Sequence, residues 1–140
     1  RQFEAIVPRT FQEACREHPD AVMDNMIRIS RMLETPCFKP KDAVAILIAG
    51  VEGLTRRVWP CEANRDGGVG RTLREKASSP RELERRFAII GMGLWQGYRN
   101  AATHKVDFTC SFHEARHYLS GIRAMVDLAK RIEAERKHNN

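Results

Sequence analysis

The stretch FAIIGMGLWQGYRNAATH (Phe87–His104) joins an apolar, glycine-rich segment to a polar end. Its apolar residues recur at steps of three and four, which predicts a helix. They form two stripes, one of Phe87, Ile90, Leu94 and Tyr98 and another of Ala88, Met92 and Trp95. A small helical bundle needs one covered stripe on each helix. We therefore expect this helix to be central and its second stripe to be buried against another subunit.

Three glycines, Gly91, Gly93 and Gly97, lie within the same helix. Each costs the helix up to about 1 kcal/mol relative to alanine. We expect the close approach of a neighbouring backbone or of a ligand to compensate for this cost.

The rest of the chain also predicts helices, because no segment alternates with period two. Three capping boxes indicate helix starts, at Thr10–Glu13, Ser79–Glu82 and Ser111–Glu114. Apolar residues at helical spacing follow Asp20 as far as Leu33, follow Asp42 as far as Trp59, and run from Phe112 to Ala129. Residues 61–70 are glycine-rich and predict a mobile loop, followed by a short helix around Arg71–Lys76.

These patterns predict an all-α fold, a compact bundle of four to five helices forming a single domain over residues 1–140. Lys137–Asn140 is expected to be a frayed, polar tail. The chain begins at Arg1 rather than at a methionine, which suggests the C-terminal part of a longer protein.

The chain is basic, with a net charge of +6 and 18 arginines among its 24 basic residues. Arginine binds phosphate through two parallel hydrogen bonds, so a polyanion is an expected partner. No apolar run is long enough for a membrane span, and no signal-peptide pattern is present. The four cysteines lack paired spacing, which favours reduced thiols in a cytoplasmic protein.

Arg99, Asn100 and His104 follow the apolar part of the central helix. On an ideal helix Asn100 and His104 share a face, whereas Arg99 lies about 140° from His104. A single copy of the helix therefore does not bring the guanidinium and the imidazole together. Two copies around a twofold axis, or a kink after Arg99, would do so.

The pattern Arg99-Asn100-x-x-x-His104, after an apolar glycine-rich helix in a small all-α domain, resembles the HEPN superfamily. The phrase GLWQGYRNAATH, preceded by Gly70-Arg-Thr-Leu-Arg, is similar to its Ymh-like branch, which usually has proline where Ala101 or Ala102 stands. HEPN domains are helical bundles of toxin–antitoxin, abortive-infection, CRISPR and restriction-linked systems, and many are metal-independent ribonucleases.

The resemblance implies a homodimer that forms through the motif-bearing helix, so that each composite site contains two copies of Arg99 and His104. It implies that Asn100 orients the histidine or holds the phosphate, and that no metal or cofactor is needed. The expected partners are RNA, a second copy of the chain, and an antitoxin or another defence-system protein. Phe108 stands where some antitoxin-paired members carry a tyrosine that the partner modifies, which disfavours that form of regulation.

The residue types suit RNA cleavage without a metal. A base must take the proton of the 2′-hydroxyl, an acid must protonate the 5′ leaving oxygen, and a cation must stabilise the charged phosphorane. Histidine transfers protons near neutral pH, and arginine supplies a permanent positive charge to phosphate oxygens. The sequence thus favours an endoribonuclease with Arg99, Asn100 and His104 as catalytic residues.

Several alternatives remain open. The motif can simply be an exposed helix C-terminus, where basic residues interact favourably with the helix dipole. The domain can also be a non-catalytic module, which binds nucleotide or nucleic acid or dimerises to regulate an attached effector. The candidate RNA-binding residues can instead form a solvated face or, for the aromatic ones, the core; they are Arg74, Arg81, Arg85, Arg86, Lys105 and Tyr98, with Trp95 as a further stacking candidate. Cys110-x2-His113-x3-His117 has metal-like spacing but lacks a fourth ligand, so an exposed histidine pair is expected there.

Overall fold

The computed structural model describes residues 13, 15–17, 19–36, 39–65, 68–103 and 110–139, with the side chains of 19–25 and 98–103 excepted. Every regular element among them is helical, which confirms the all-α prediction. The elements are α2 (Pro19–Leu33), α3 (Pro40–Val58), the short 3-10 helix η1 (Glu62–Asn64), α4 (Gly68–Lys76), α5 (Glu82–Thr103) and α6 (Phe112–Asn139). None of the helices over these ranges has the length and apolar character that crossing a membrane requires.

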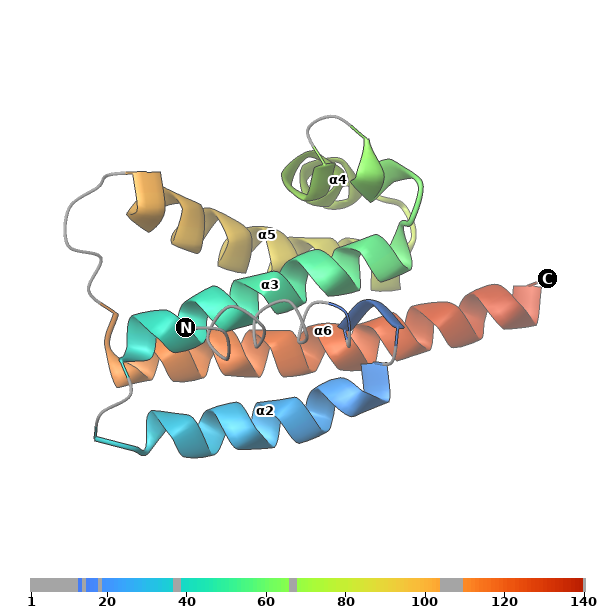
Figure 1. Cartoon of the computed structure of the whole chain (residues 1–140). Helices are drawn as coiled ribbons and strands as arrows, with labels where there is room; N and C mark the ends of the chain where they lie inside the picture. The colour runs from blue at the N-terminus through green and yellow to red at the C-terminus, as the bar shows by residue number, and fades with distance from the viewer. Residues whose placement is uncertain are drawn as a thin grey trace.

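The long helix α6 connects the bundle, because it packs against α2, α3 and α5. Figure 1 shows α2, α3 and α6 side by side, with α5 on the other side of α3 from α2. The short helix α4 packs on α5 and α3 at the side of the molecule away from α2. The helix that carries the motif is therefore covered by α3, α4 and α6.

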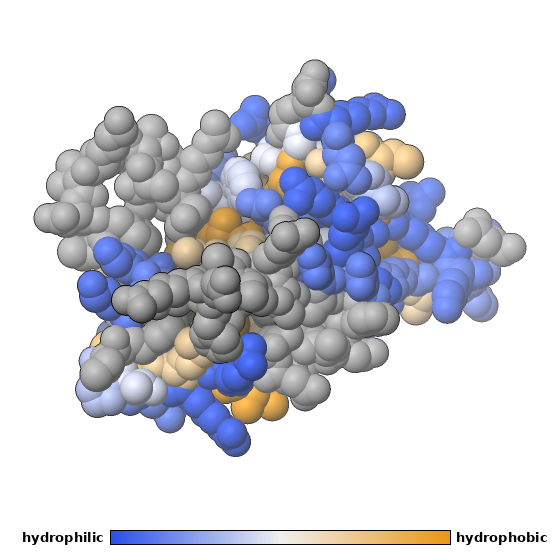
Figure 2. Space-filling view, viewed as in Figure 1, coloured by the Kyte–Doolittle hydropathy of each residue, from blue (hydrophilic) through white to orange (hydrophobic). Residues whose placement is uncertain are grey.

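The core lies where α3, α5 and α6 meet. Val44, Leu47, Val51 and Leu54 of α3 are fully buried, as are Phe87 and Ala88 of α5 and Ile122 and Met125 of α6. The spacing of three and four residues places the buried residues of α3 on one side of that helix, and likewise those of α6. On the face shown in Figure 2, hydrophilic residues gather over α4 and the C-terminal part of α6, and hydrophobic atoms appear in smaller areas.

Several helix boundaries differ from the prediction. α3 begins at Pro40 rather than at Asp42, because proline suits the first helical position and Asp42 then lies in the first turn near the positive end of the helix dipole. The loop prediction for residues 61–70 is wrong in part, since η1 and the start of α4 lie within it. Gly68 has a φ of 47°, which explains why a glycine begins α4.

The capping predictions have mixed outcomes. At α6, the Ser111 amide donates to Glu114 Oε1 at 3.2 Å and the Glu114 amide donates to Ser111 Oγ at 3.1 Å, which confirms the box. At α5, Ser79 Oγ accepts the Arg81 amide, but the Ser79 amide donates to the Lys76 carbonyl. The second capping box predicted that the Ser79 amide donates to the Glu82 carboxylate, and this part of the prediction is therefore wrong. Of the Thr10–Glu13 box, only Glu13 lies within the described residues.

The last helix departs from its prediction at both ends. Phe112, expected in the core, is 47% exposed, whereas the other predicted core positions of α6 are buried. The helix also continues to Asn139, through most of the expected tail.

The second apolar stripe of α5 is covered within the chain. Ala88 is fully buried, and Met92 and Trp95 pack against the core. Gly70 of α4 approaches Trp95 so closely that a Cβ at position 70 would lie 2.9 Å from the indole Nε1. The stripe therefore gives no reason to expect a second subunit, and dimerisation stays a prediction.

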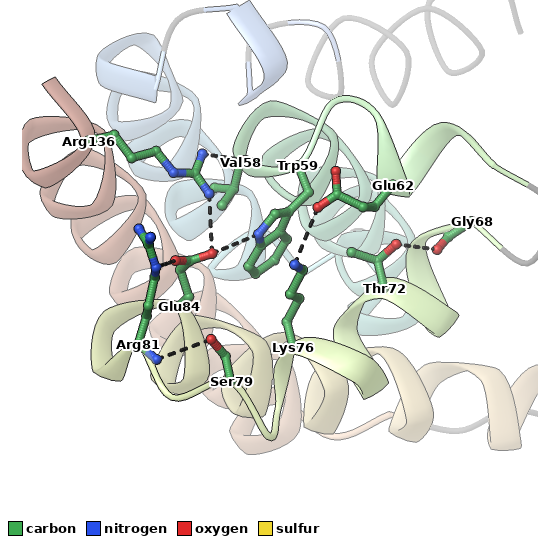
Figure 3. A network of polar contacts seen from close by, with 10 residues as sticks. All are labelled: Val58, Trp59, Glu62, Gly68, Thr72, Lys76, Ser79, Arg81, Glu84 and Arg136. Carbon is green, nitrogen blue, oxygen red and sulfur yellow. Dashed lines mark hydrogen bonds and ion pairs between the residues drawn. The ribbon is translucent and has the colours of Figure 1, made fainter. Parts of the chain in front are cut away.

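A buried carboxylate joins the ends of three helices (Figure 3). Glu84, in the first turn of α5, is 8% exposed and accepts hydrogen bonds from Trp59 Nε1 at 3.0 Å and from Arg136 Nη2 at 3.3 Å. Arg136 also donates to the Val58 carbonyl at the end of α3, and Arg81 forms a looser ion pair with Glu84 at 3.7 Å. We call Glu84, Trp59, Arg81 and Arg136 the Glu84 cluster.

Glu84→Ala is expected to lower the free energy of unfolding by about 2–4 kcal/mol, because it leaves the buried indole N–H and the Arg136 guanidinium without their acceptor. The matched control is Glu82→Ala, two residues away, where an exposed ion pair with Arg86 spans 4.0 Å. Its loss should cost less than about 0.5 kcal/mol. Urea denaturation measures both, and equal effects would show that the Glu84 cluster does not stabilise the junction.

Candidate functional site

The C-terminal half of α5 borders an open hollow of about 400 Å³. Gly93 and Leu94 of α5 line it, together with four residues from the first two turns of α6: His113, Glu114, His117 and Tyr118. The two helices cross closely here, because a Cβ at Gly121 of α6 would lie 2.8 Å from a methyl carbon of Leu94. We call this space the α5–α6 hollow.

The Tyr118 hydroxyl lies directly against the backbone of α5. A Cβ at Gly97 would lie 2.5 Å from this oxygen. Within the described part of the chain, no residue forms a hydrogen bond with the hydroxyl. Position 97 precedes Arg99 and Asn100 by two and three residues, which is roughly 3–5 Å along the helix axis. The Tyr118 hydroxyl thus lies within one helical turn of the motif.

The surroundings of Tyr118 keep its phenol neutral. Partial burial raises the pKa of Tyr118, and the nearby Cys110 and Glu114 raise it further. Burial, followed by the charge of Glu114, also raises the pKa of the Cys110 thiol. At neutral pH, Tyr118 is therefore a hydrogen-bond donor, and Cys110 is a thiol rather than a nucleophilic thiolate.

The two histidines of the hollow lie one turn apart on α6 and are exposed, as predicted. The His117 ring meets the Tyr118 ring edge to face, with 6.3 Å between centroids and 79° between planes. No group of three His, Cys, Asp or Glu side chains among the described residues is arranged to hold a metal ion. Sequence reasoning found the histidine pair but missed its position beside the motif-bearing helix.

The structure describes the predicted catalytic residues only in part. Arg99 and Asn100 lie in the last turns of α5, as does Tyr98; the side chains of all three, and the whole of His104, Lys105 and Phe108, lie outside the described residues. On the helix, position 100 lies on the same side as the exposed residues Gly93 and Gln96. Position 99 lies on the same side as Met92 and Trp95, which faces α4.

Three of the four predicted RNA-binding arginines, Arg81, Arg85 and Arg86, lie near the start of α5, at the other end of the helix from the motif. Arg85 is 14 residues before Arg99 on the same helix, which is roughly 21 Å. Its guanidinium donates to the Ser79 carbonyl at 3.2 Å, Arg81 pairs with Glu84, and Arg86 pairs with Glu82. Arg74 is exposed in the last turn of α4. The structure thus groups Arg81, Arg85 and Arg86 at the opposite end of α5, where each contacts its own chain.

Comparisons of the chain with protein-family models, with curated proteins and with solved structures find no match. The likeness to HEPN domains therefore depends on the motif residues and on the all-helical context. It stays a prediction.

Two glycine substitutions one turn apart test the contact between Gly97 and Tyr118. Nothing lies within 4 Å of a Cβ at Gly93, so Gly93→Ala should raise the free energy of unfolding by about 0.5–1 kcal/mol through helix propensity. Gly97→Ala must displace the Tyr118 hydroxyl, so it should gain less and should change the near-ultraviolet circular dichroism. Identical stabilities and spectra for the two variants would contradict this contact.

Proposed function

We propose that this domain is a metal-independent endoribonuclease whose active site combines Arg99, Asn100 and His104 from two copies of the chain. The observation that carries the proposal is the position of the motif. The first turn of α5 is fixed in the core by the Glu84 cluster, and the helix borders an open hollow at Gly93 and Leu94, up to about two turns before the positions of Arg99 and Asn100. A helix that is held in the core at one end and borders accessible space further along is a suitable support for catalytic groups.

The proposed reaction is a transesterification within the substrate. One His104 imidazole removes the proton of a ribose 2′-hydroxyl, whose oxygen then attacks the adjacent phosphorus. Arg99 stabilises the charge on the phosphorane oxygens through its fixed pair of donors. The second His104, protonated, donates a proton to the departing 5′-oxygen. The products are a 2′,3′-cyclic phosphate and a 5′-hydroxyl, and the two histidines have exchanged protonation states.

Two copies of the chain are part of the proposal because positions 99 and 104 are about 140° apart on an ideal helix. The proposed contact surface is the exposed side of α5. Ile89 on this side is 50% exposed, and Gln96 follows it towards position 100. Gly91 lies outside this surface, since it packs against Leu73 and Met125 of its own chain.

His104→Ala and Arg99→Ala should each reduce RNA cleavage by about 10²- to 10⁴-fold, because each removes proton transfer or charge stabilisation from the transition state. Arg99→Lys should not restore full activity, since an ammonium lacks the paired donors. The assay uses mixed RNA in EDTA, with His138→Ala in the exposed last turn of α6 as the matched control. The mechanism would be overturned if His104→Ala cleaves RNA at the wild-type rate, or if cleavage requires a divalent metal. If the protein binds RNA but does not cleave it, the non-catalytic module would be favoured.

Ile89→Glu should convert the dimer to a monomer and lower cleavage in parallel, because it places a charge in the proposed interface. Ile27→Glu is a matched control, since Ile27 is a similarly exposed isoleucine (53%) on α2. Light scattering at micromolar concentration measures both. A monomeric wild-type protein, or equal behaviour of the two variants, would rule out this interface.

A further inference from the structure

We infer that the α5–α6 hollow binds one unpaired nucleotide of an RNA strand, with its base stacked on the imidazoles of His113 and His117 and its sugar–phosphate near the Tyr118 hydroxyl. The inference rests on the proposed ribonuclease function and extends it, because it names a subsite for the nucleotide beside the scissile phosphate. Neither histidine had a role in the proposed reaction.

The size and the lining of the hollow suit a single base. Its volume of about 400 Å³ is in the range of small-molecule sites. Gly93 contributes no side chain, and no atom lies within 4 Å of a Cβ placed there, so a flat ring can approach the helix. Unpaired RNA bases are recognised by stacking on aromatic side chains, histidine among them.

The charges of the hollow favour a base over a phosphate as its occupant. Glu114 also lines the space, and its carboxylate would repel a phosphate placed next to it. One of its oxygens accepts the Ser111 amide at 3.2 Å, which holds the group at the start of α6. A carboxylate in this position can accept a hydrogen bond from the amino group of a base.

The Tyr118 hydroxyl indicates the direction in which the backbone of the bound RNA would run. The phenol is adjacent to His117 and reaches the α5 backbone at Gly97. Its raised pKa leaves it neutral at physiological pH, so it can donate to a sugar or phosphate oxygen without repelling the strand. A nucleotide with its base between α5 and α6 would extend its backbone past this hydroxyl towards Arg99 and Asn100.

The test measures binding separately from cleavage. Fluorescence anisotropy with a short, fully 2′-O-methylated RNA, which has no free 2′-hydroxyl to attack phosphorus, gives the Kd of the wild type and of the double variant His113→Ala/His117→Ala. The Kd should rise about 5- to 100-fold, the usual effect of removing one stacking contact. His138→Ala is the matched control and should stay within about twofold. Both histidines are exposed, so the double variant should fold normally.

If a base stacks in the hollow, removing that base and removing the two histidines should not have additive effects on binding. Scanning single abasic sites through the oligonucleotide should find one that weakens wild-type binding but has little additional effect on the double variant. With cleavable RNA, the double variant should raise KM and leave kcat within about threefold.

The outcomes separate this inference from the proposed function. An unchanged Kd for the double variant, or a wild type that does not bind the RNA, would overturn the subsite, whatever His104→Ala does to cleavage. Weakened binding by the double variant of a protein that never cleaves RNA would support the subsite and contradict the ribonuclease.

Discussion

The enclosure of α5 by three other helices is the constraint on which the rest of the structure depends. Phe87 and Ala88 are fully buried, and Gly91 is in close contact with side chains of α4 and α6. At its first turn, Glu84 joins α5 to the ends of α3 and α6 through the Glu84 cluster. A narrow strip through Gly93 and Gln96 stays exposed on this helix and leads to the motif. Burial of the helix thus leaves this strip as an accessible side of α5.

The sequence predicted the helices well because periodicity and capping are local. The Ser111–Glu114 box, for example, depends on four consecutive residues. Which helix covers a given stripe is not a local property. Gly70 of α4 contacts Trp95 of α5. This contact covers the second apolar stripe of α5, which was expected to face a second subunit. The Glu84 cluster was not predicted from the sequence, because the partners Trp59 and Arg136 are 25 and 52 residues away from Glu84.

The sequence suggested candidate residues for the site, but it did not predict what surrounds them. Arg99, Asn100 and His104 could be identified from their order alone. The α5–α6 hollow could not, because its six lining residues come from two helices that meet only when the chain reverses between them. Three of the arginines that charge suggested as one RNA-binding group, Arg81, Arg85 and Arg86, contact groups of their own chain near the start of α5. We propose that RNA recognition depends on stacking in the α5–α6 hollow as well as on charge.

The central claim is that the attacking group belongs to the substrate and that the protein moves its proton. A direct measurement uses an RNA with a known cleavage position and a second RNA that lacks only the 2′-hydroxyl on the ribose whose 3′-oxygen carries the scissile phosphate. In EDTA, this account predicts that the first is cut to a 2′,3′-cyclic phosphate and a 5′-hydroxyl, and that the second is bound but not cut at this position. Cleavage of both RNAs at the same rate, or products that end in a 5′-phosphate, would contradict it.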